Sequence, residues 1–167
     1  MIALKKATEQ DIPVIREIAR ITWEPTYVPL IGREQVDYML EKMYNEGALL
    51  EQLSEGHTFL IAEIGKKAIG FAGYSVIDHE ARIYKLHKLY VLPEVHGQGV
   101  GKFLINEVVD RVRDLGATSL ELNVNRANKA KAFYERAGFE IKETVDIEIG
   151  NGFQMNDYVM AKPILPA

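Results

Sequence analysis

The sequence predicts an α/β protein with a mixed β-sheet that carries helices on both faces. Three observations lead to this prediction. Helical and strand-like spacings of apolar residues alternate along the chain. Two pairs of strand-like segments meet at the hairpin signals Gly65-Lys66 and Gly150-Asn151-Gly152. A third strand-like segment runs through a glycine-dense turn into an amphipathic helix. With 167 residues the chain is long enough for a sizeable core, and we expect residues 1–167 to form a single domain.

The first half of the chain begins with a strand from Ile2 to Ala7, followed by Thr8 and Asp11, a pair typical of a helix start. Apolar residues then repeat at helical spacing, and Pro25 and Pro29 predict a break over 23–31. The elements expected next are helices over 33–44 and 48–53 and strands over 57–64, 67–77 and 82–91.

The second half begins with a helix from Val100 to Leu115, which we expect to bury Leu115 and to end at Gly116. A strand over 119–124 and a short helix capped by Asn128 and ended by Gly138 follow. The last two strands are expected over 139–149 and 153–162.

Composition narrows the classes of function. The chain contains no cysteine, which excludes disulfides, thiolate catalysis and a cysteine-based zinc site. Its four histidines show no ligand spacing, so we expect no metal. No apolar run approaches the ~18 residues of a membrane span, and no signal peptide opens the chain, so we expect a cytoplasmic protein without a membrane partner. The net charge of −4 disfavours nucleic acid and permits a cationic substrate.

The stretch from Leu89 to Lys102 is the most informative part of the sequence. A strand ends at Pro93, and glycines then stand at alternate positions, 97, 99 and 101, directly before a helix. Glycines let the backbone approach a ligand closely, and the N–H groups at a helix start favour an anion. The segment predicts a diphosphate site, although an ordinary tight turn between strand and helix is the alternative.

A second segment makes the first more specific. Asn128 begins the pattern N-x-x-x-x-F-Y-E-R-x-G-F, which ends at Phe139 and leads into a strand. The order of strand, HGQGVG turn, long helix, strand and this pattern resembles the GNAT family of acetyl-CoA-dependent N-acetyltransferases. His96, Gly99 and Gly101 match that family's Q/R-x-x-G-x-G/A motif, with histidine in the first place. The resemblance implies a mostly antiparallel central sheet with helices on both faces.

The resemblance also implies direct transfer of an acetyl group from acetyl-CoA to a primary amine in a ternary complex. The backbone amide of Leu89 would polarise the thioester carbonyl, and Val91 would bind the pantetheine arm. Tyr134 would donate a proton to the sulfur of coenzyme A, which requires a tightly positioned hydroxyl. The alternative for Tyr134 is a core aromatic residue beside Phe133.

Most of the remaining cofactor contacts lie around the glycine turn. The residues expected to bind coenzyme A are Leu89, Tyr90, Val91, His96, Gly97, Gln98, Gly99, Val100, Gly101, Lys102, Asn128, Lys131 and Tyr134. Asn128 lies one residue nearer to the tyrosine than the family spacing, so a plain helix cap is an equal alternative. Lys102, Lys129 and Lys131 could meet phosphates or could be solvated surface lysines. His96 could donate a ring N–H to a phosphate, and the affinity would then weaken as rising pH removes the charge of the ring.

The general base is the least defined catalytic group. Many family members place a glutamate four residues before the position of Leu89, where this chain has Lys85, which cannot act as a base while charged. His87 lies on the same strand face as Leu89 and is our candidate. A partly exposed histidine without a role and deprotonation through water are the alternatives.

The acceptor site is expected between the first two helices. Trp23, Tyr27 and Tyr38 are the candidate substrate-binding residues, because aromatic faces suit an ammonium group. They could equally pack the helices together. The I-T-W-E-P-T-Y segment and the M-N-D-Y-V-M-A-K tail resemble the bacterial polyamine acetyltransferase branch of the family. Acceptors on peptide N-termini or lysines, and a non-catalytic acetyl-CoA sensor, are the other functions considered. A homodimer through the last hairpin is the expected assembly.

Overall fold

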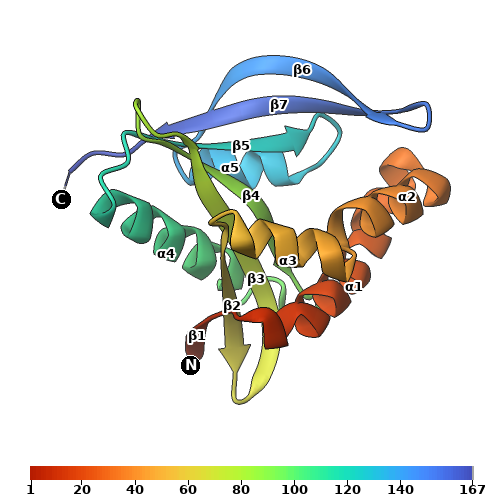
Figure 1. Cartoon of the computed structure of the whole chain (residues 1–167), viewed down its shortest axis with the longest axis horizontal. Coiled ribbons are helices and arrows are strands. Elements are labelled where there is room, and N and C mark those ends of the chain that lie inside the picture. Colours follow the sequence, from red (N-terminus) through yellow and green to blue (C-terminus); the bar gives the residue numbers. More distant parts are fainter. Residues whose placement is uncertain (167) are drawn as a thin grey trace. The chain divides into compact units, whose positions relative to one another are not determined.

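The structure is a computed structural model that describes residues 1–166. Figure 1 shows its helices and strands. In chain order they are β1 (Ile2–Lys6), α1 (Ile12–Ile31), α2 (Arg33–Tyr44), α3 (Glu46–Ser54), β2 (Thr58–Ile64), β3 (Lys67–Asp78), β4 (Ile83–Val91), α4 (Val100–Asp114), β5 (Ser119–Asn125), α5 (Ala130–Arg136), β6 (Glu140–Gly150) and β7 (Phe153–Pro163). Short 3₁₀ helices occupy Glu9–Asp11 (η1) and Pro93–Val95 (η2).

All seven strands belong to one sheet in the order β1-β2-β3-β4-β5-β7-β6. β4 and β5 pair in parallel, whereas β1–β2, β2–β3, β5–β7 and β6–β7 are antiparallel. The predicted α/β fold with a mixed, mostly antiparallel sheet and flanking helices is therefore confirmed. Within residues 1–166, no helix combines the length and the apolar character that crossing a membrane requires.

The chain forms two compact units. The first consists of Met1–Ser75 and Lys88–Val108, and the second of Val76–His87 and Val109–Ala167. The chain passes from one unit to the other inside β3, β4 and α4. A single domain stays a prediction.

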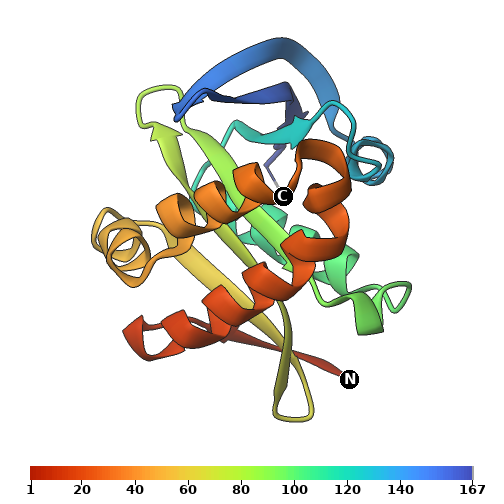
Figure 2. The same ribbon diagram turned by 90° about the vertical axis from the view of Figure 1, so that its right-hand side faces the viewer.

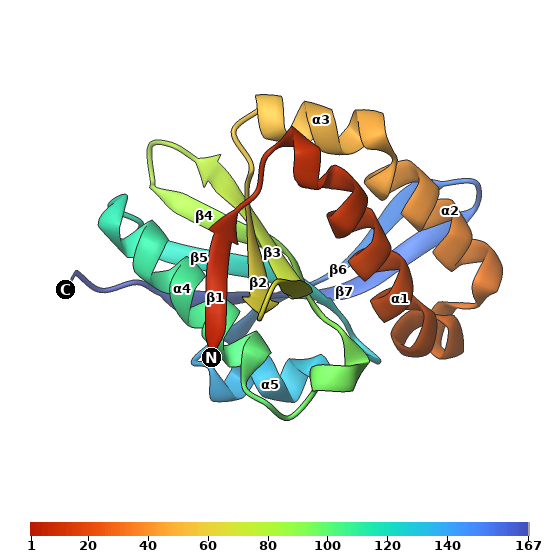
Figure 3. The same cartoon turned by 90° about the horizontal axis from the view of Figure 1, so that it is seen from below.

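The first unit is built around β1, β2 and β3. Figure 3 shows α1, α2 and α3 on one face of these strands and the beginning of α4 on the other. β2 is therefore covered on both faces, and its residues Phe59, Leu60 and Ile61 are almost completely buried. A strand that is buried on both faces reads as a continuous apolar run, which is what the sequence shows there.

The predicted break over 23–31 is wrong. α1 continues to Ile31 with Pro25 and Pro29 inside it, and Figure 2 shows that the helix changes direction in its second half. A proline removes one backbone hydrogen bond and bends a helix without necessarily ending it. The buried residues of α1 stop at Trp23, so the bend falls in a part of the helix that faces outward. The helix ends at Gly32, whose φ of 87° is favourable for glycine.

The second unit places β5 between β4 and β7, with α5 against β5. β6 and β7 form the predicted hairpin, in which Asn151 has a φ of 55° between two glycines of positive φ. Leu120, Leu122 and Met160 are buried in this unit, together with Val112 of α4. The prediction that α4 buries Leu115 is wrong, because α4 ends at Asp114 and Leu115 is 59% exposed at the turn.

Candidate active site

The residues predicted to bind the cofactor are divided between the two units. Those around the glycine turn belong to the first unit, and Asn128, Lys131 and Tyr134 belong to the second, which also contains His87, the predicted base.

The turn is held at its entrance by the end of β4. The Leu92 N–H donates to the Ile69 carbonyl oxygen at 2.8 Å, and η2 follows directly. Nε2 of His96 lies 2.9 Å from the carbonyl oxygen of Val91. Because a carbonyl oxygen only accepts, Nε2 carries the proton and donates it. This hydrogen bond thus ties the turn at His96 to the last residue of β4.

The glycines give the turn its shape. Gly97 and Gly99 have φ values of 84° and 79°, a region that favours glycine. A Cβ atom at either position would meet nothing within 4 Å, so the space beside both glycines is open. The sequence-based reason for glycine at these positions, free approach of a ligand to the backbone, is consistent with this geometry.

The N–H groups of the turn are available to a ligand. Within residues 1–166, no hydrogen bond is donated by the backbone N–H groups of Gly97, Gly99, Val100, Gly101 and Lys102. Three of these belong to the first turn of α4, where N–H groups lack partners inside the helix and the helix dipole is positive. Such a row of donors fits a diphosphate, and the residues present therefore fit coenzyme A.

An aromatic cluster lies beside this strand in the first unit. The ring of Trp23 lies 4.7 Å from Tyr27, 5.9 Å from Tyr44 and 6.0 Å from Tyr90, measured between centroids. The structure thus brings together two of the predicted acceptor residues, Trp23 and Tyr27, and adds Tyr44, which the sequence analysis missed. Burial raises the pKa of the Tyr44 phenol, and Tyr27 adds to the effect. The third predicted residue, Tyr38, lies on α2 with Lys42 5.7 Å from its ring centroid.

A buried lysine adjoins the cluster and was also missed. Lys88 is 6% exposed, and its Nζ donates to Oε1 of Gln52 at 2.8 Å. The same ammonium lies 5.4 Å from the Tyr44 ring and 5.6 Å from the Phe59 ring. Aromatic faces stabilise a cation that has lost water. The cluster therefore already holds one cation next to Leu89.

In the second unit, Tyr134 lies on α5 and is 9% exposed. Its ring centroid is 5.3 Å from that of Phe133 and 5.9 Å from that of Phe139. Both readings of this residue stay open: the two rings fix its position, as a proton donor requires, and they also make it part of the core.

Asn128 and Lys131 have local partners at the start of α5. The Oδ1 atom of Asn128 accepts the N–H of Ala130 at 2.9 Å, and the helix begins at Ala130 with Lys129 in the cap position. Asn128 therefore stabilises the helix start from the residue before the cap position, and the helix begins one residue later than predicted. Lys131 pairs with Glu135 at 3.3 Å and lies 5.7 Å from the Tyr158 ring.

A polar surface occupies one face of β4, β5 and β7 in this unit. Strand pairing sets Lys85 opposite Glu121 and Asn125 opposite Asp157, and Asn123 lies between them on the same face. Glu121 accepts from Lys142 at 2.8 Å, and Asn123 Nδ2 lies 3.4 Å from Asp157 Oδ2. The sequence analysis missed Asp157, which shares its face of β7 with Val159, and the structure shows that both residues are buried.

Burial is the largest influence on the pKa values of two groups on this surface. It raises the pKa of the Asp157 carboxyl, against the opposing effects of Asn123, Lys85 and Arg126. It lowers the pKa of the Lys85 amine, against the effects of Asp157 and Glu121. His87, the predicted base, is half-buried on β4 two residues after Lys85. No group of three or more potential metal-ligating side chains occurs among the described residues.

Comparison with known proteins agrees with this geometry. The chain is 28% identical over 157 residues to an uncharacterised N-acetyltransferase of Mycobacterium tuberculosis, covering 93% of this chain and 99% of that protein. It is 27% identical over 149 residues to spermidine N(1)-acetyltransferase of Thermoplasma acidophilum, covering 86% of this chain and 91% of that protein. The crystal structure of PaiA N-acetyltransferase from Thermoplasma acidophilum in complex with coenzyme A superimposes with a TM-score of 0.82 at 26% identity, covering 98% of this chain and 99% of that one.

A profile of the acetyltransferase (GNAT) family matches residues 15–139. This range holds the glycine turn, α4, β5 and α5. The chain therefore belongs to the GNAT family, whose members are acetyl-CoA-dependent N-acetyltransferases.

Proposed function

We propose that this enzyme transfers the acetyl group of acetyl-CoA directly to a primary amine of a small polyamine such as spermidine. The observation that carries the cofactor part is the group of backbone N–H donors at Gly97 and residues 99–102, none of which donates a hydrogen bond within residues 1–166. The polyamine part is supported by the similarity to a spermidine acetyltransferase, by the acidic chain and by the aromatic cluster around Trp23. A cytoplasmic location belongs to the same proposal.

The turn residues bind the diphosphate in this proposal. The backbone N–H groups of Gly97 and of residues 99–102 donate to phosphate oxygens. His96 has a different role from the one expected, because Nε2 is already bonded to Val91. Its other nitrogen donates only when the ring is protonated, so His96 mainly fixes the turn. Lys102 and Lys131 add positive charge, the latter in competition with Glu135.

Two further groups act on the reacting atoms. Bound acetyl-CoA supplies an activated acyl carbon and a thiol leaving group. The backbone N–H of Leu89 stabilises the negative charge that develops on the carbonyl oxygen, and Val91 binds the pantetheine arm. The Tyr134 hydroxyl holds the proton that the sulfur takes as it leaves. The packing of Tyr134 between Phe133 and Phe139 keeps this hydroxyl in one place.

The acceptor binds against the aromatic cluster. Tyr27 presents a ring face to its ammonium groups with the buried Trp23 packed behind it, and Tyr38 on α2 contributes a further ring that already attracts Lys42. A long amine with several ammonium groups can contact several of these rings at once, whereas an apolar acceptor has no ammonium group to place against them. Asn128 stabilises the start of α5 in this proposal, by accepting the Ala130 N–H, rather than serving as a cofactor ligand.

A thiol-release assay tests the proposal. Acetyl-CoA is offered with spermidine, an arylalkylamine and a peptide with a free N-terminus, and spermidine should give the highest kcat/KM. Tyr134→Phe should lower kcat by about 10²-fold, the usual contribution of a general acid, with the Kd of coenzyme A within about twofold of wild type. Tyr158→Phe removes another phenol of the second unit and should leave kcat unchanged.

Three outcomes would contradict parts of the proposal. Faster turnover of the peptide would move the acceptor to protein N-termini. Binding of coenzyme A without turnover of any amine would identify a sensor. An unchanged kcat in Tyr134→Phe would leave this tyrosine with its packing role alone.

A further inference from the structure

The second unit contains a buried carboxylate that the roles above do not use. Asp157 is 3% exposed, and its partner is a neutral amide, Asn123, at 3.4 Å. A buried carboxylate is normally paired with a cation, because removing its charge from water is unfavourable. In the part of the chain that the structure describes, no lysine, arginine or histidine nitrogen lies within 4.0 Å of Asp157.

The other two buried carboxylates make the contrast clear. Asp11 pairs with Lys5 at 2.9 Å, and Glu121 pairs with Lys142 at 2.8 Å. Glu121 lies on the same sheet face as Asp157, so a lysine partner is sterically feasible on this surface. Asp157 therefore differs from its neighbours in lacking a cation, and an incoming ammonium group would supply one.

The charges around Asp157 leave it able to accept a proton. Arg126 acts on it through space but is paired with Asp146 of β6. Lys85 of β4 also acts only through space, and burial lowers the pKa of Lys85 itself. Glu121 and Lys142 neutralise each other. The net result of burial and these groups is a raised pKa for Asp157, which favours a protonated carboxyl more than an exposed aspartate would.

We propose that the Asp157 carboxylate is the general base that deprotonates the ammonium group of the acceptor. The inference rests on the proposed function, because it requires an amine acceptor. It also assigns the role of base to a residue other than His87, the candidate of the sequence analysis, in a chain that has Lys85 where many family members carry a glutamate. Asp157 reaches the same face of the sheet from β7 instead of β4.

The proton balance of the step is complete. An N–H bond of the ammonium breaks, its electron pair stays on nitrogen, and the proton binds to a carboxylate oxygen of Asp157. The neutral amine forms the C–N bond as the C–S bond breaks. The second proton lost by nitrogen returns to Tyr134, which has given its own phenol proton to the sulfur. One proton is released overall, and Asp157 passes it to solvent.

The test compares Asp157→Asn with the wild-type enzyme and with Glu121→Gln, which neutralises the paired carboxylate of the same face. The substrate is spermidine, or the fastest primary amine of the panel above. Asp157→Asn should lower kcat/KM at pH 7 by about 10²-fold. Without the base, only acceptor that is already deprotonated in solution can react, so the kcat/KM of this variant should rise about tenfold per pH unit. Glu121→Gln should stay within about threefold of wild type in the same assay.

A second variant gives a readout that a purely structural role would not move. Asn123 lowers the pKa of Asp157, so Asn123→Ala should shift the acidic limb of the kcat/KM profile to higher pH and retain the plateau. Calorimetry with coenzyme A checks the fold of every variant. If Asp157→Asn does not bind coenzyme A, Asp157→Ser replaces it in the comparison.

The outcomes separate this proposal from the proposed function. Wild-type turnover with an unchanged kcat/KM and pH profile in Asp157→Asn overturns the role of Asp157 alone. An unmoved acidic limb in Asn123→Ala does the same. Absence of wild-type turnover with every amine of the panel overturns both.

Discussion

Gly70 on β3 shows how a single residue determines the position of the cofactor strand. A Cβ atom at this position would lie 2.9 Å from the carbonyl oxygen of Tyr90 and 3.3 Å from Cγ2 of Val91. It would also lie 3.4 Å from Leu104 of α4. The backbone oxygen cannot rotate away as a side chain could, so the end of β4 can lie this close only because residue 70 has no side chain.

Gly70→Ala should therefore disturb binding of the cofactor as well as stability. We expect a loss of about 1–3 kcal/mol in the free energy of unfolding, the usual effect of overpacking. The Kd of coenzyme A should rise at the same time, because Tyr90 and Val91 would be displaced. Urea denaturation and calorimetry measure the two effects. Gly47→Ala in α3 is the control, since its Cβ would meet only a side-chain oxygen at 3.3 Å, and it should leave the Kd unchanged.

Individual residues of the site were predictable where their function follows from local sequence. The glycines of the 97–101 turn are an example, because their spacing predicts an open turn before a helix, and Gly97 and Gly99 have positive φ with open space beside them. Asp157 and Lys88 were not predictable. Each is a charged residue in a strand, and only the pairing of distant strands shows that it is buried and what surrounds it.

The junction between β1 and α1 illustrates how an element boundary is encoded. The Asp11 carboxylate accepts the backbone N–H of Thr8 at 2.8 Å and the ammonium of Lys5 at 2.9 Å. Burial opposes the charged form, but these bonds outweigh it and lower the pKa of Asp11 from its ordinary 3.8. Thr8 in turn accepts the N–H of Gln10, and the two side chains form a capping box at the helix start that the sequence predicted.

Asp11→Asn should make the enzyme less stable at neutral pH by about 1 kcal/mol, the typical contribution of a cap. Because the folded pKa of Asp11 is lowered, its stabilising effect is fully present above the unfolded pKa and is lost as the pH falls through the folded value. The difference between the two proteins should thus narrow below pH 3.8. Urea denaturation from pH 7 downward measures this difference. A gap that stayed constant into acid would mean that the charge of Asp11 does not contribute.

At this scale the sequence predicted most elements but not the path of α1. The hairpins at 65–66 and 150–152 and the helices α2 and α4 were predictable because their turns and periodicities are local. Pro25 and Pro29 predicted an end to α1, yet the helix continues to Gly32. A proline removes only one backbone hydrogen bond of a helix and bends it. Whether the helix continues past the bend depends on tertiary packing, which cannot be read from the local sequence.

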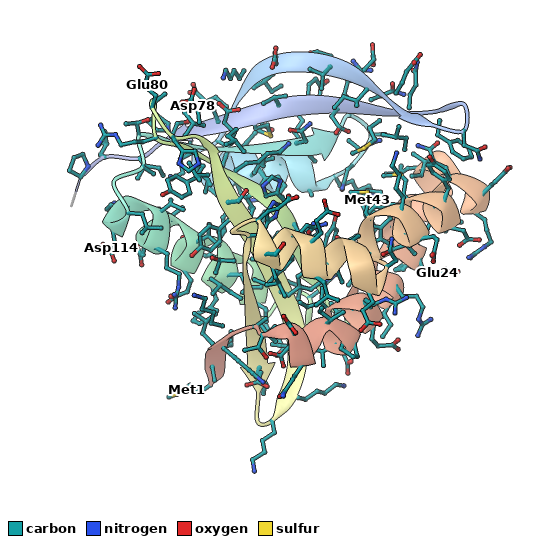
Figure 4. All side chains as sticks on the ribbon, in the orientation of Figure 1. Met1, Glu24, Met43, Asp78, Glu80 and Asp114 are labelled. Carbon is teal, nitrogen blue, oxygen red and sulfur yellow. The ribbon has the colours of Figure 1, made fainter. Side chains whose placement is uncertain are left out.

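The whole molecule carries an excess of negative charge that reaches both units. Figure 4 shows the carboxylates of Glu24, Asp78, Glu80 and Asp114 pointing away from the ribbon, and the net charge is −4. A field of this sign attracts polycations over distances comparable to the Debye length. It acts on each charge of the acceptor, so a triamine should respond to it more strongly than a monoamine.

Salt should therefore discriminate between acceptors. Raising the ionic strength from about 0.01 M to about 0.15 M shortens the screening length from roughly 30 Å to roughly 8 Å. The KM for spermidine should rise several-fold over this range, whereas the KM for a monoamine such as butylamine should rise much less. The kcat values should change little for either amine, because the reacting atoms lie within a few ångströms of the groups that act on them and are screened less. Initial-rate measurements with saturating acetyl-CoA determine both constants, and NaCl and KCl should act alike. Equal salt sensitivity of the two amines would show that recognition of the acceptor does not depend on its additional charges, and would argue against polyamines as the substrate class.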